Sequence, residues 1–392
     1  MGLREDYLKA SKREKTILLD EYIKNTGQNR KYVIQTLNGP EIWADQGKRR
    51  KPRKNKYGPE VNAPLVLLWR IFDFPCGQRL KPCIEAELER LRDFGEINIS
   101  DQLAEQLKSM SSATIDRRLK VPRKGEHNRR FSTTRPGSLL KAKIPIRLTT
   151  WDTKKIGYLE TDLVAHCGAS AFGEYGNTVS LTEIAVGWWE GEAILGKTQK
   201  ATLEALKLMR LRTPFTWLGL DADNGGEFIN YPLWNYCNQE KLEFTRSREN
   251  KKNDNAYVEQ KNWTHVRKML GYLRYDTPKE LAIINNLYRT ELRLYKNFFQ
   301  PIMKLKKKMR LGAKRHRQYE VAKTPYQRLT ESKQIKQPTR NHLTTLYQQL
   351  NPAALKRTID RKLYLLYQTH QSKRKNSIKR TLPRREVISV RS

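Results

Sequence analysis

The 392-residue sequence is poor in cysteine and has no long apolar run. Its four cysteines are too few for a disulfide framework and predict reduced intracellular thiols. No stretch approaches the roughly 18 consecutive apolar residues of a transmembrane helix. The charged first residues lack the apolar centre of a secretory signal. We therefore expect a cytoplasmic protein without a membrane partner.

Acidic residues are also scarce: 41 stand against 77 basic residues, which gives a net charge of +36. The imbalance is uneven along the chain. Residues 1–147 carry 32 basic and 18 acidic residues, residues 148–290 carry 18 of each, and residues 291–392 carry 27 and 5. A neutral centre between two basic flanks is not what a uniformly solubilising charge would produce. The flanks predict contact with the phosphates of a nucleic acid.

Two segments before residue 121 predict helix-turn-helix units. In residues 13–38, Ile17, Leu18, Tyr22 and Ile23 mark a first helix, Gly27 ends it, and Asn29 can cap a second. Residues 64–93 and 101–110 also show helical patterns.

After residues 101–110, Ser112 is a candidate N-cap of a further helix. That helix would project three side chains toward DNA, namely Thr114, Arg117 and Arg118. Helical hairpins that bind nothing are the competing interpretation of both segments.

Composition and patterning divide the chain into six expected regions. These are an N-terminal helix-turn-helix (1–46), a second helical DNA-binding region (47–120), a linker (121–147), a catalytic core (148–290), a basic C-terminal DNA-binding region (291–372) and a disordered basic tail (373–392). The pattern of the core predicts strands and helices in the order β-β-β-α-β-α-β-α. This order predicts an α/β fold with a mixed sheet.

Carboxylates inside the apolar core segments predict a metal site. Asp162 interrupts a strand-like run, Asp223 follows the end of another strand, and Glu259 lies on a later helix. Buried carboxylates are usually paired or bind metal, and ligands of α/β proteins gather at strand ends. Three such groups at one sheet edge would hold two Mg²⁺ ions, for which Mn²⁺ could substitute.

Neighbouring residues offer competing assignments. Asp221 is a nearby acid, but it falls within the strand. Glu227 is expected to open the next helix and Asp254 to cap the helix that bears Glu259. On that helix, Arg267 could contact a DNA phosphate or form a salt bridge, while Trp263 is expected to pack in the core.

The spacing of Asp162, Asp223 and Glu259 along the chain is informative. Asp223 and Glu259 have 35 residues between them, and Asp162 precedes Asp223 by 61. With the phrases DADNGGEFIN and NDNAYVEQKNWTHVRKMLGY, this region resembles bacterial insertion-sequence DDE transposases with a retroviral-integrase catalytic core. The resemblance implies a ribonuclease-H-like fold preceded by helix-turn-helix domains and followed by a basic C-terminal region.

The resemblance also implies an activity. The triad would hold two Mg²⁺ ions and catalyse DNA strand cleavage and strand transfer. Double-stranded DNA, both element ends and target, would be the partner, and a homo-oligomer would assemble on paired ends in the bacterial nucleoid. A non-catalytic helix-turn-helix regulator and a nuclease acting on RNA–DNA hybrids are the alternatives.

Other catalytic chemistries have no support in the sequence. Cys76 and Cys83 lack histidine partners, and the adjacent pair His166-Cys167 does not make a zinc site. No Ser-His-Asp set and no Walker-type glycine loop is recognisable.

Overall fold

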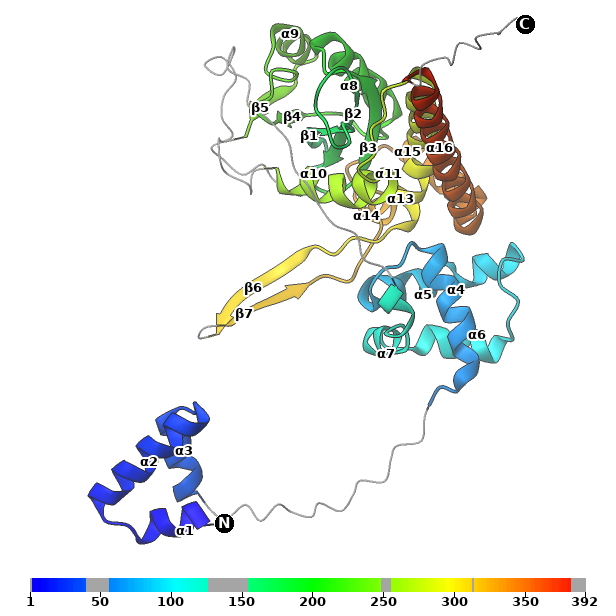
Figure 1. The fold of residues 1–392 in the computed structure, drawn as a ribbon. Coiled ribbons are helices and arrows are strands. Elements are labelled where there is room, and N and C mark those ends of the chain that lie inside the picture. Colours follow the sequence, from blue (N-terminus) through cyan, green and yellow to red (C-terminus); the bar gives the residue numbers. More distant parts are fainter. Residues whose placement is uncertain (1, 40–55, 126–153, 248–254, 312–313, 382–392) are drawn as a thin grey trace, which may run out of the picture. The chain divides into compact units, whose positions relative to one another are not determined.

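The computed structural model describes residues 2–39, 56–125, 154–247, 255–311 and 314–381 (Figure 1). The chain forms two compact units, Met1–Gly58 and Pro59–Ser392, which are described separately. Within the described ranges, no helix combines the length and apolar character that a membrane span requires.

The first unit is a three-helix bundle. It contains α1 (Gly2–Lys9), α2 (Lys12–Thr26) and α3 (Arg30–Asn38). As the sequence predicts, Gly27 ends α2 in a left-handed conformation with φ 67°, and the Asn29 side chain caps α3 by accepting the Lys31 N–H. The predicted apolar face of α2 is wrong in one respect. Leu19 enters the small core with Tyr7 and Val33, whereas Ile17 is exposed.

The second unit opens with helices. They are η1 (Pro59–Val61), α4 (Asn62–Ile71), α5 (Gly77–Asp93), α6 (Asp101–Ser109), α7 (Ser112–Arg118) and η2 (Pro122–Gly125). The predicted N-cap of α7 is off by one residue. Ser111 has the extended backbone of a cap and accepts the Thr114 N–H at 3.2 Å, while Ser112 is already helical. Most of the expected linker, 126–147, lies outside the described residues, as do residues 40–55.

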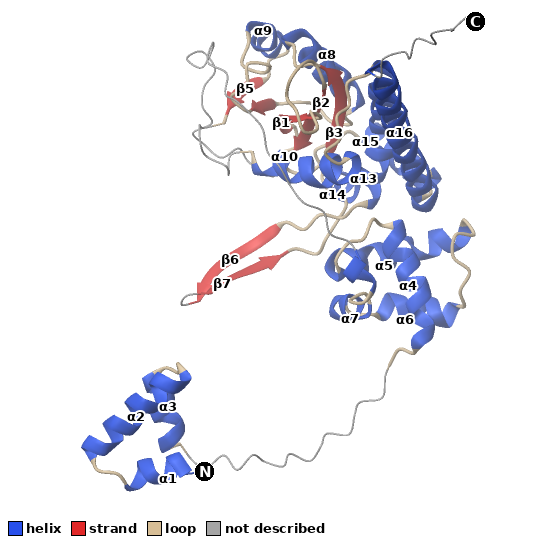
Figure 2. Ribbon diagram, viewed as in Figure 1, coloured by secondary structure: helices blue, strands red, loops and turns tan. Residues whose placement is uncertain are grey.

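A five-stranded mixed sheet follows, and it confirms the predicted fold class (Figure 2). Its strands are β1 (Tyr158–Ala165), β2 (Gly176–Glu183), β3 (Trp189–Leu195), β4 (Gly219–Ala222) and β5 (Glu243–Arg246). They lie in the order β3-β2-β1-β4-β5. The first three are antiparallel, and β4 and β5 run parallel to β1. This is the ribonuclease-H-like arrangement.

Helices cover both faces of the sheet. Helices α8 (Gln199–Arg212) and α9 (Tyr231–Gln239) enclose one apolar core, which includes Leu206, Leu220 and Leu233. A second group of helices contains α10 (Ala256–Lys261), the π-helix η3 (Asn262–Arg267), α11 (Lys268–Leu270), α12 (Pro278–Leu287), the π-helix η4 (Tyr288–Leu292) and α13 (Arg293–Phe299). There the Trp189 ring meets Tyr288 edge-on, with 5.5 Å between ring centroids. Because both faces are covered, every residue of β2 is buried.

The C-terminal region is more structured than the sequence predicts. It contains a two-stranded hairpin, β6 (Leu305–Leu311) and β7 (Lys314–Tyr319), and then α14 (Pro325–Glu331), α15 (Gln337–Gln349) and α16 (Pro352–Thr381). The expected disordered tail, 373–392, is therefore wrong as far as Thr381, and 382–392 lie outside the described residues. Lys373 joins this helix to α12 and the residues before it, because its ammonium lies 2.8 Å from Asp276 and 2.9 Å from Glu280.

Two buried acids on β3 are paired with arginines. Glu190 lies 2.8 Å from Arg293 and 3.2 Å from Arg212, and Glu192 lies 2.9 Å from Arg212. Both carboxylates are almost wholly buried. The arginines supply the charge-assisted hydrogen bonds that make such burial tolerable.

Removing one partner from this cluster should cost stability. We expect Glu190→Gln to lower the free energy of unfolding by about 3 kcal/mol, because it removes the buried carboxylate that pairs with the partly buried Arg293 and Arg212. Urea denaturation measures the effect. The control is Glu204→Gln, an exposed partner of Lys207 that should cost less than about 1 kcal/mol. Equal losses for the two variants would contradict this account of the cluster.

Candidate active site

The register of two parallel strands places two aspartates side by side. β1 pairs with β4 from Tyr158–Gly219 to Thr161–Ala222, so Asp162 and Asp223 are the next residues along the two strands. Adjacent strands lie about 4.8 Å apart. Asp162 is still inside β1, whereas Asp223 has just left β4.

A turn fixes Asp223 after the strand. The Gly225 N–H donates to Asp223 Oδ1 at 2.9 Å. The Asn224 side chain donates to the Ser247 carbonyl at 2.9 Å and accepts from Arg246 at 3.0 Å, which ties the turn to the end of β5. The Asp-Asn-Gly sequence thus makes a braced turn that presents the carboxylate.

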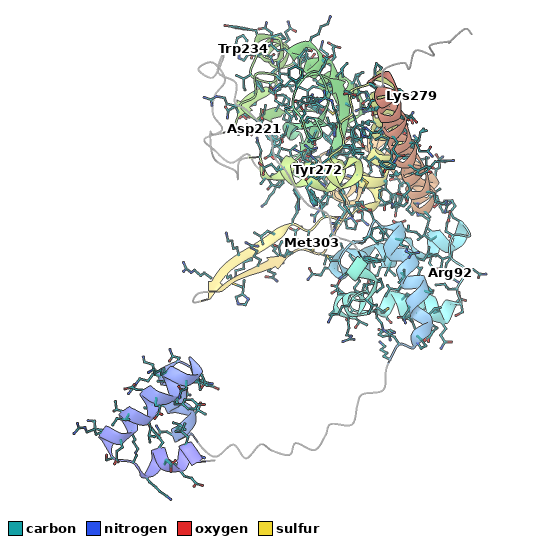
Figure 3. The ribbon with its side chains drawn as sticks, in the orientation of Figure 1. Arg92, Asp221, Trp234, Tyr272, Lys279 and Met303 are labelled. Atoms are coloured by element: carbon teal, nitrogen blue, oxygen red, sulfur yellow. The ribbon has the colours of Figure 1, made fainter. Side chains whose placement is uncertain are left out.

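The competing acid Asp221 has a different environment. It is fully buried within β4, and Figure 3 labels its position. Its carboxylate accepts a hydrogen bond from the Thr245 hydroxyl of β5. Asp221 therefore belongs to the sheet interior.

Asp162 and Asp223 both resist ionisation. Burial, followed by the charges of Asp223 and Glu259, raises the pKa of Asp162 to about 8, although hydrogen bonds from the Leu163 N–H and Asn262 partly oppose this. Burial and the charge of Glu227 raise the pKa of Asp223 to about 6, against the Gly225 hydrogen bond and the Lys197 charge. Close carboxylates with raised pKa values are a common sign of a functional site.

Glu259, the third predicted site residue, is less closely associated with the two aspartates. Glu259 is exposed on α10, and its charge acts on Asp162 less strongly than that of Asp223. Among the described residues, no three histidine, cysteine, aspartate or glutamate side chains are grouped as metal ligands. The donor chemistry of the aspartate pair fits Mg²⁺, which prefers one or two carboxylates plus water and phosphate oxygens. Glu259 is therefore not grouped with Asp162 and Asp223 as a metal ligand.

Glu160 is a site residue that the sequence analysis missed. It lies two residues before Asp162 on β1 and is fully buried. Its Oε2 accepts the backbone N–H groups of Tyr257 at 3.0 Å and Val258 at 3.1 Å, at the start of α10. Anions stabilise helix N-termini in this way. Glu160 could have been found from the sequence, because it lies two residues from Asp162 in an apolar strand and alternate strand residues share a face.

Glu160 therefore fixes the beginning of the helix that carries Glu259. A π-helix follows directly, and its first residue, Asn262, donates to Asp162 Oδ2 at 2.6 Å. Such π-helical turns are frequent at functional sites. The β1 acids and the α10–η3 helix are thus joined at two points.

Two further candidates, Arg267 and Glu227, interact electrostatically with the aspartate pair. The Arg267 guanidinium stacks over the Tyr272 ring, 4.9 Å from its centroid, and burial lowers its pKa. Trp263 is partly buried. Asp254 lies outside the described residues. The expectation for Glu227 is wrong: it lies in the turn before α9, because Asn230 caps that helix.

The expected DNA-reading residues on α7 differ in exposure. Arg117 is exposed. Thr114 lies 3.0 Å from the Ser111 hydroxyl, and Arg118 donates to Asn62 at 2.9 Å; both are partly buried.

Sequence comparison identifies one relative over most of the chain. The uncharacterized protein y4rM of Sinorhizobium fredii (strain NBRC 101917 / NGR234) is 36% identical over 328 residues, which cover 83% of this chain and 92% of that protein. The chain belongs to the same family as y4rM. No family model matches the sequence.

Among solved structures, the chain is similar to retroviral integrases. The HTLV-2 integrase catalytic core domain in complex with magnesium, in its dimeric form, is 13% identical with a TM-score of 0.28, over 37% of this chain and 88% of that chain. The BIV integrase catalytic core is 16% identical with a TM-score of 0.27, over 44% and 91%. The simian T-cell lymphotropic virus intasome is 12% identical with a TM-score of 0.30, over 54% and 69%.

The raised pKa of Asp162 predicts a pH-dependent stability. The folded state retains its proton up to about pH 8, whereas the unfolded chain loses it near 3.8. The folded state thus binds more protons in this interval, so stability falls as pH rises through it. In metal-free protein, Asp162→Asn should raise the free energy of unfolding at pH 8 by about 1–2 kcal/mol and flatten the pH dependence.

Denaturation with EDTA between pH 4 and 8 measures this effect. Asp276→Asn is the control, because hydrogen bonds and charges from Lys373 and Arg274 hold the pKa of Asp276 down despite its burial. An Asp162 variant that is less stable than wild type at pH 8 would refute the prediction.

The Glu160 contacts predict a local effect on α10. Glu160→Gln removes the negative charge at the helix N-terminus, and we expect hydrogen exchange of the Tyr257 and Val258 amides to accelerate by about tenfold, or roughly 1.4 kcal/mol of local opening. Exchange within β2 should be unchanged. Unaltered exchange at both α10 amides would mean that Glu160 does not hold the helix.

Proposed function

We propose that the chain is a DDE-type transposase or integrase that binds the ends of a mobile element and catalyses metal-dependent DNA strand cleavage and strand transfer. The observation that supports this most is the Asp162–Asp223 pair. Glu190 and Glu192 are neutralised by arginines, but these two aspartates lie side by side on adjacent strands, and the charge of Asp223 raises the pKa of Asp162. Carboxylates arranged in this way suit a divalent cation.

Asp162, Asp223 and Glu259 are the proposed ligands of two Mg²⁺ ions. When bound, the metal would supply an activated water or DNA 3′-hydroxyl and would stabilise negative charge on the leaving 3′-oxygen. Because Glu259 lies on an exposed helix surface, its carboxylate is accessible to a metal and DNA arriving from solvent.

The protein's own residues position the proposed ligands. Asn262 orients Asp162, the Gly225 N–H orients Asp223, and Glu160 holds the first turn of the helix that bears Glu259. In cleavage, water attacks the phosphorus at the element end and the 3′-oxygen leaves. In strand transfer, that 3′-hydroxyl attacks a target phosphodiester and replaces its 3′-oxygen. Neither step requires a covalent bond to the protein.

The flanking elements are proposed to bind DNA. The α2–α3 and α6–α7 helix pairs would act as helix-turn-helix units, with Thr114, Arg117 and Arg118 contacting the element end. Arg267 would contact phosphate beside the catalytic pair. The C-terminal region would bind DNA with less selectivity, and a homo-oligomer would hold paired ends.

The alternative is a non-catalytic DNA-binding regulator. It is favoured by one observation, which is that Glu259 is not grouped with the two aspartates as a metal ligand. It does not account for the cost of placing Asp162 beside Asp223.

Strand cleavage by purified protein tests the proposed function. The substrate is a labelled duplex that carries the DNA flanking the protein's own gene, incubated with Mg²⁺ or EDTA. We expect Mg²⁺-dependent nicking and joining, with Asp223→Asn and Glu259→Gln losing more than the roughly 10–100-fold that is typical of groups supporting metal ligands.

Glu240→Gln is the matched control, because Glu240 pairs with Arg210 on the core surface. It should retain wild-type activity. DNA binding without cleavage in Mg²⁺ or Mn²⁺ would support the regulator. Cleavage that survives Asp223→Asn would show that the active site is elsewhere.

A further inference from the structure

The β6–β7 hairpin is an exposed ribbon that contains no acidic residue. Residues 305–319 include seven lysines and arginines, five of which have described side chains. The described side chains of both strands, 306–310 and 316–319 among them, are exposed. The nearest acid after β7, Glu320, is already paired with Arg328 of α14 at 2.9 Å.

Strand register gathers like charges on one face of this hairpin. Lys308 lies directly opposite Arg317, and the backbone of Arg310 is opposite Arg315. Lys308 and Arg310 are two residues apart and therefore share a face. Like charges at opposed positions destabilise a strand pair, and an isolated hairpin is only marginally stable in water. The pairing of Lys308 with Arg317 is thus costly to maintain unless a polyanion neutralises that face.

The base of the hairpin is held by the catalytic unit. Backbone hydrogen bonds join Ile302 and Lys323 in both directions, at 2.9 and 3.2 Å. The Lys304 ammonium donates to the Ile184 carbonyl after β2 at 3.1 Å. The Ile302 side chain also lies against Gly187, in the turn before β3. The ribbon is therefore attached to the sheet that carries Asp162.

We propose that the Lys308–Arg310–Arg317 face of the hairpin binds the phosphate backbone of the duplex DNA on which the catalytic unit acts. This inference rests on the proposed function and names one element of the DNA interface. Exposed lysine and arginine side chains match phosphate charge, and a two-stranded ribbon is narrow enough to follow a DNA groove. Phosphate contacts position DNA without reading its sequence. The hairpin therefore contributes affinity that is similar for all duplexes.

The test removes the three charges while keeping side chains of similar length. Full-length wild type is compared with Lys308→Gln/Arg310→Gln/Arg317→Gln by fluorescence anisotropy on two duplexes, one with the element end and one of unrelated sequence, in EDTA. We expect at least about tenfold weaker binding to both. The slope of log K against log salt should become shallower by about 0.9 for each phosphate that the variant no longer neutralises.

A matched control removes three exposed charges of the catalytic core, through Lys200→Gln/Lys241→Gln/Lys279→Gln. It should change affinity and slope much less. Thermal denaturation checks folding, and the hairpin variant should melt at or above the wild-type temperature because opposed like charges have been removed.

The possible results distinguish failure of the hairpin proposal from failure of the proposed catalytic function. Unchanged affinity and salt slope in the hairpin variant would overturn the hairpin proposal, even if Mg²⁺-dependent cleavage is intact. Selective loss of binding to duplex RNA, with duplex DNA unaffected, would also overturn it. Loss of duplex-DNA binding in protein that never cleaves would support the hairpin and contradict the proposed catalytic function.

Discussion

The parallel pairing of β1 with β4 is the constraint on which the candidate site depends. Its register brings Asp162 beside Asp223. A shift of one residue would turn the β1 side chains to the opposite face and separate the two carboxylates. The apolar packing of α8 and α9 on one face of the sheet, and of the α10–α13 helices on the other, maintains that register. Core packing and site geometry are therefore coupled.

The sheet carries several acids, and the way each is satisfied distinguishes structural from functional roles. Glu190 and Glu192 pair with arginines, and Glu160 caps a helix. These arrangements offset desolvation within the protein itself. Asp162 and Asp223 instead lie side by side on adjacent strands, and their pKa values rise. The protein thus retains a local electrostatic cost that a bound cation would relieve, which is the usual compromise between stability and activity.

The sequence predicted the central fold well because alternating apolar strands, an amphipathic helix and the Asp-Asn-Gly turn are local signals. It also singled out Asp162 and Asp223, since acids in apolar strands stand out.

It could not predict contacts between distant segments. Glu160 reaches the α10 backbone across nearly one hundred residues of chain, and Lys373 of α16 pairs with Asp276 and Glu280. The hairpin was hidden because runs of lysine and arginine carry no strand periodicity. The cap of α7 shifted by one because two adjacent serines are chemically equivalent.

The most direct test of the account is a crystal structure of the protein soaked in Mn²⁺, with anomalous scattering used to locate the metal. The account predicts an anomalous peak coordinated by Asp162 and Asp223, with Glu259 bound directly or through water, and the loss of that peak in Asp223→Asn crystals. An empty aspartate pair at saturating Mn²⁺, with both carboxylates as they are in the metal-free protein, would contradict the central claim that this pair is a metal-dependent catalytic site.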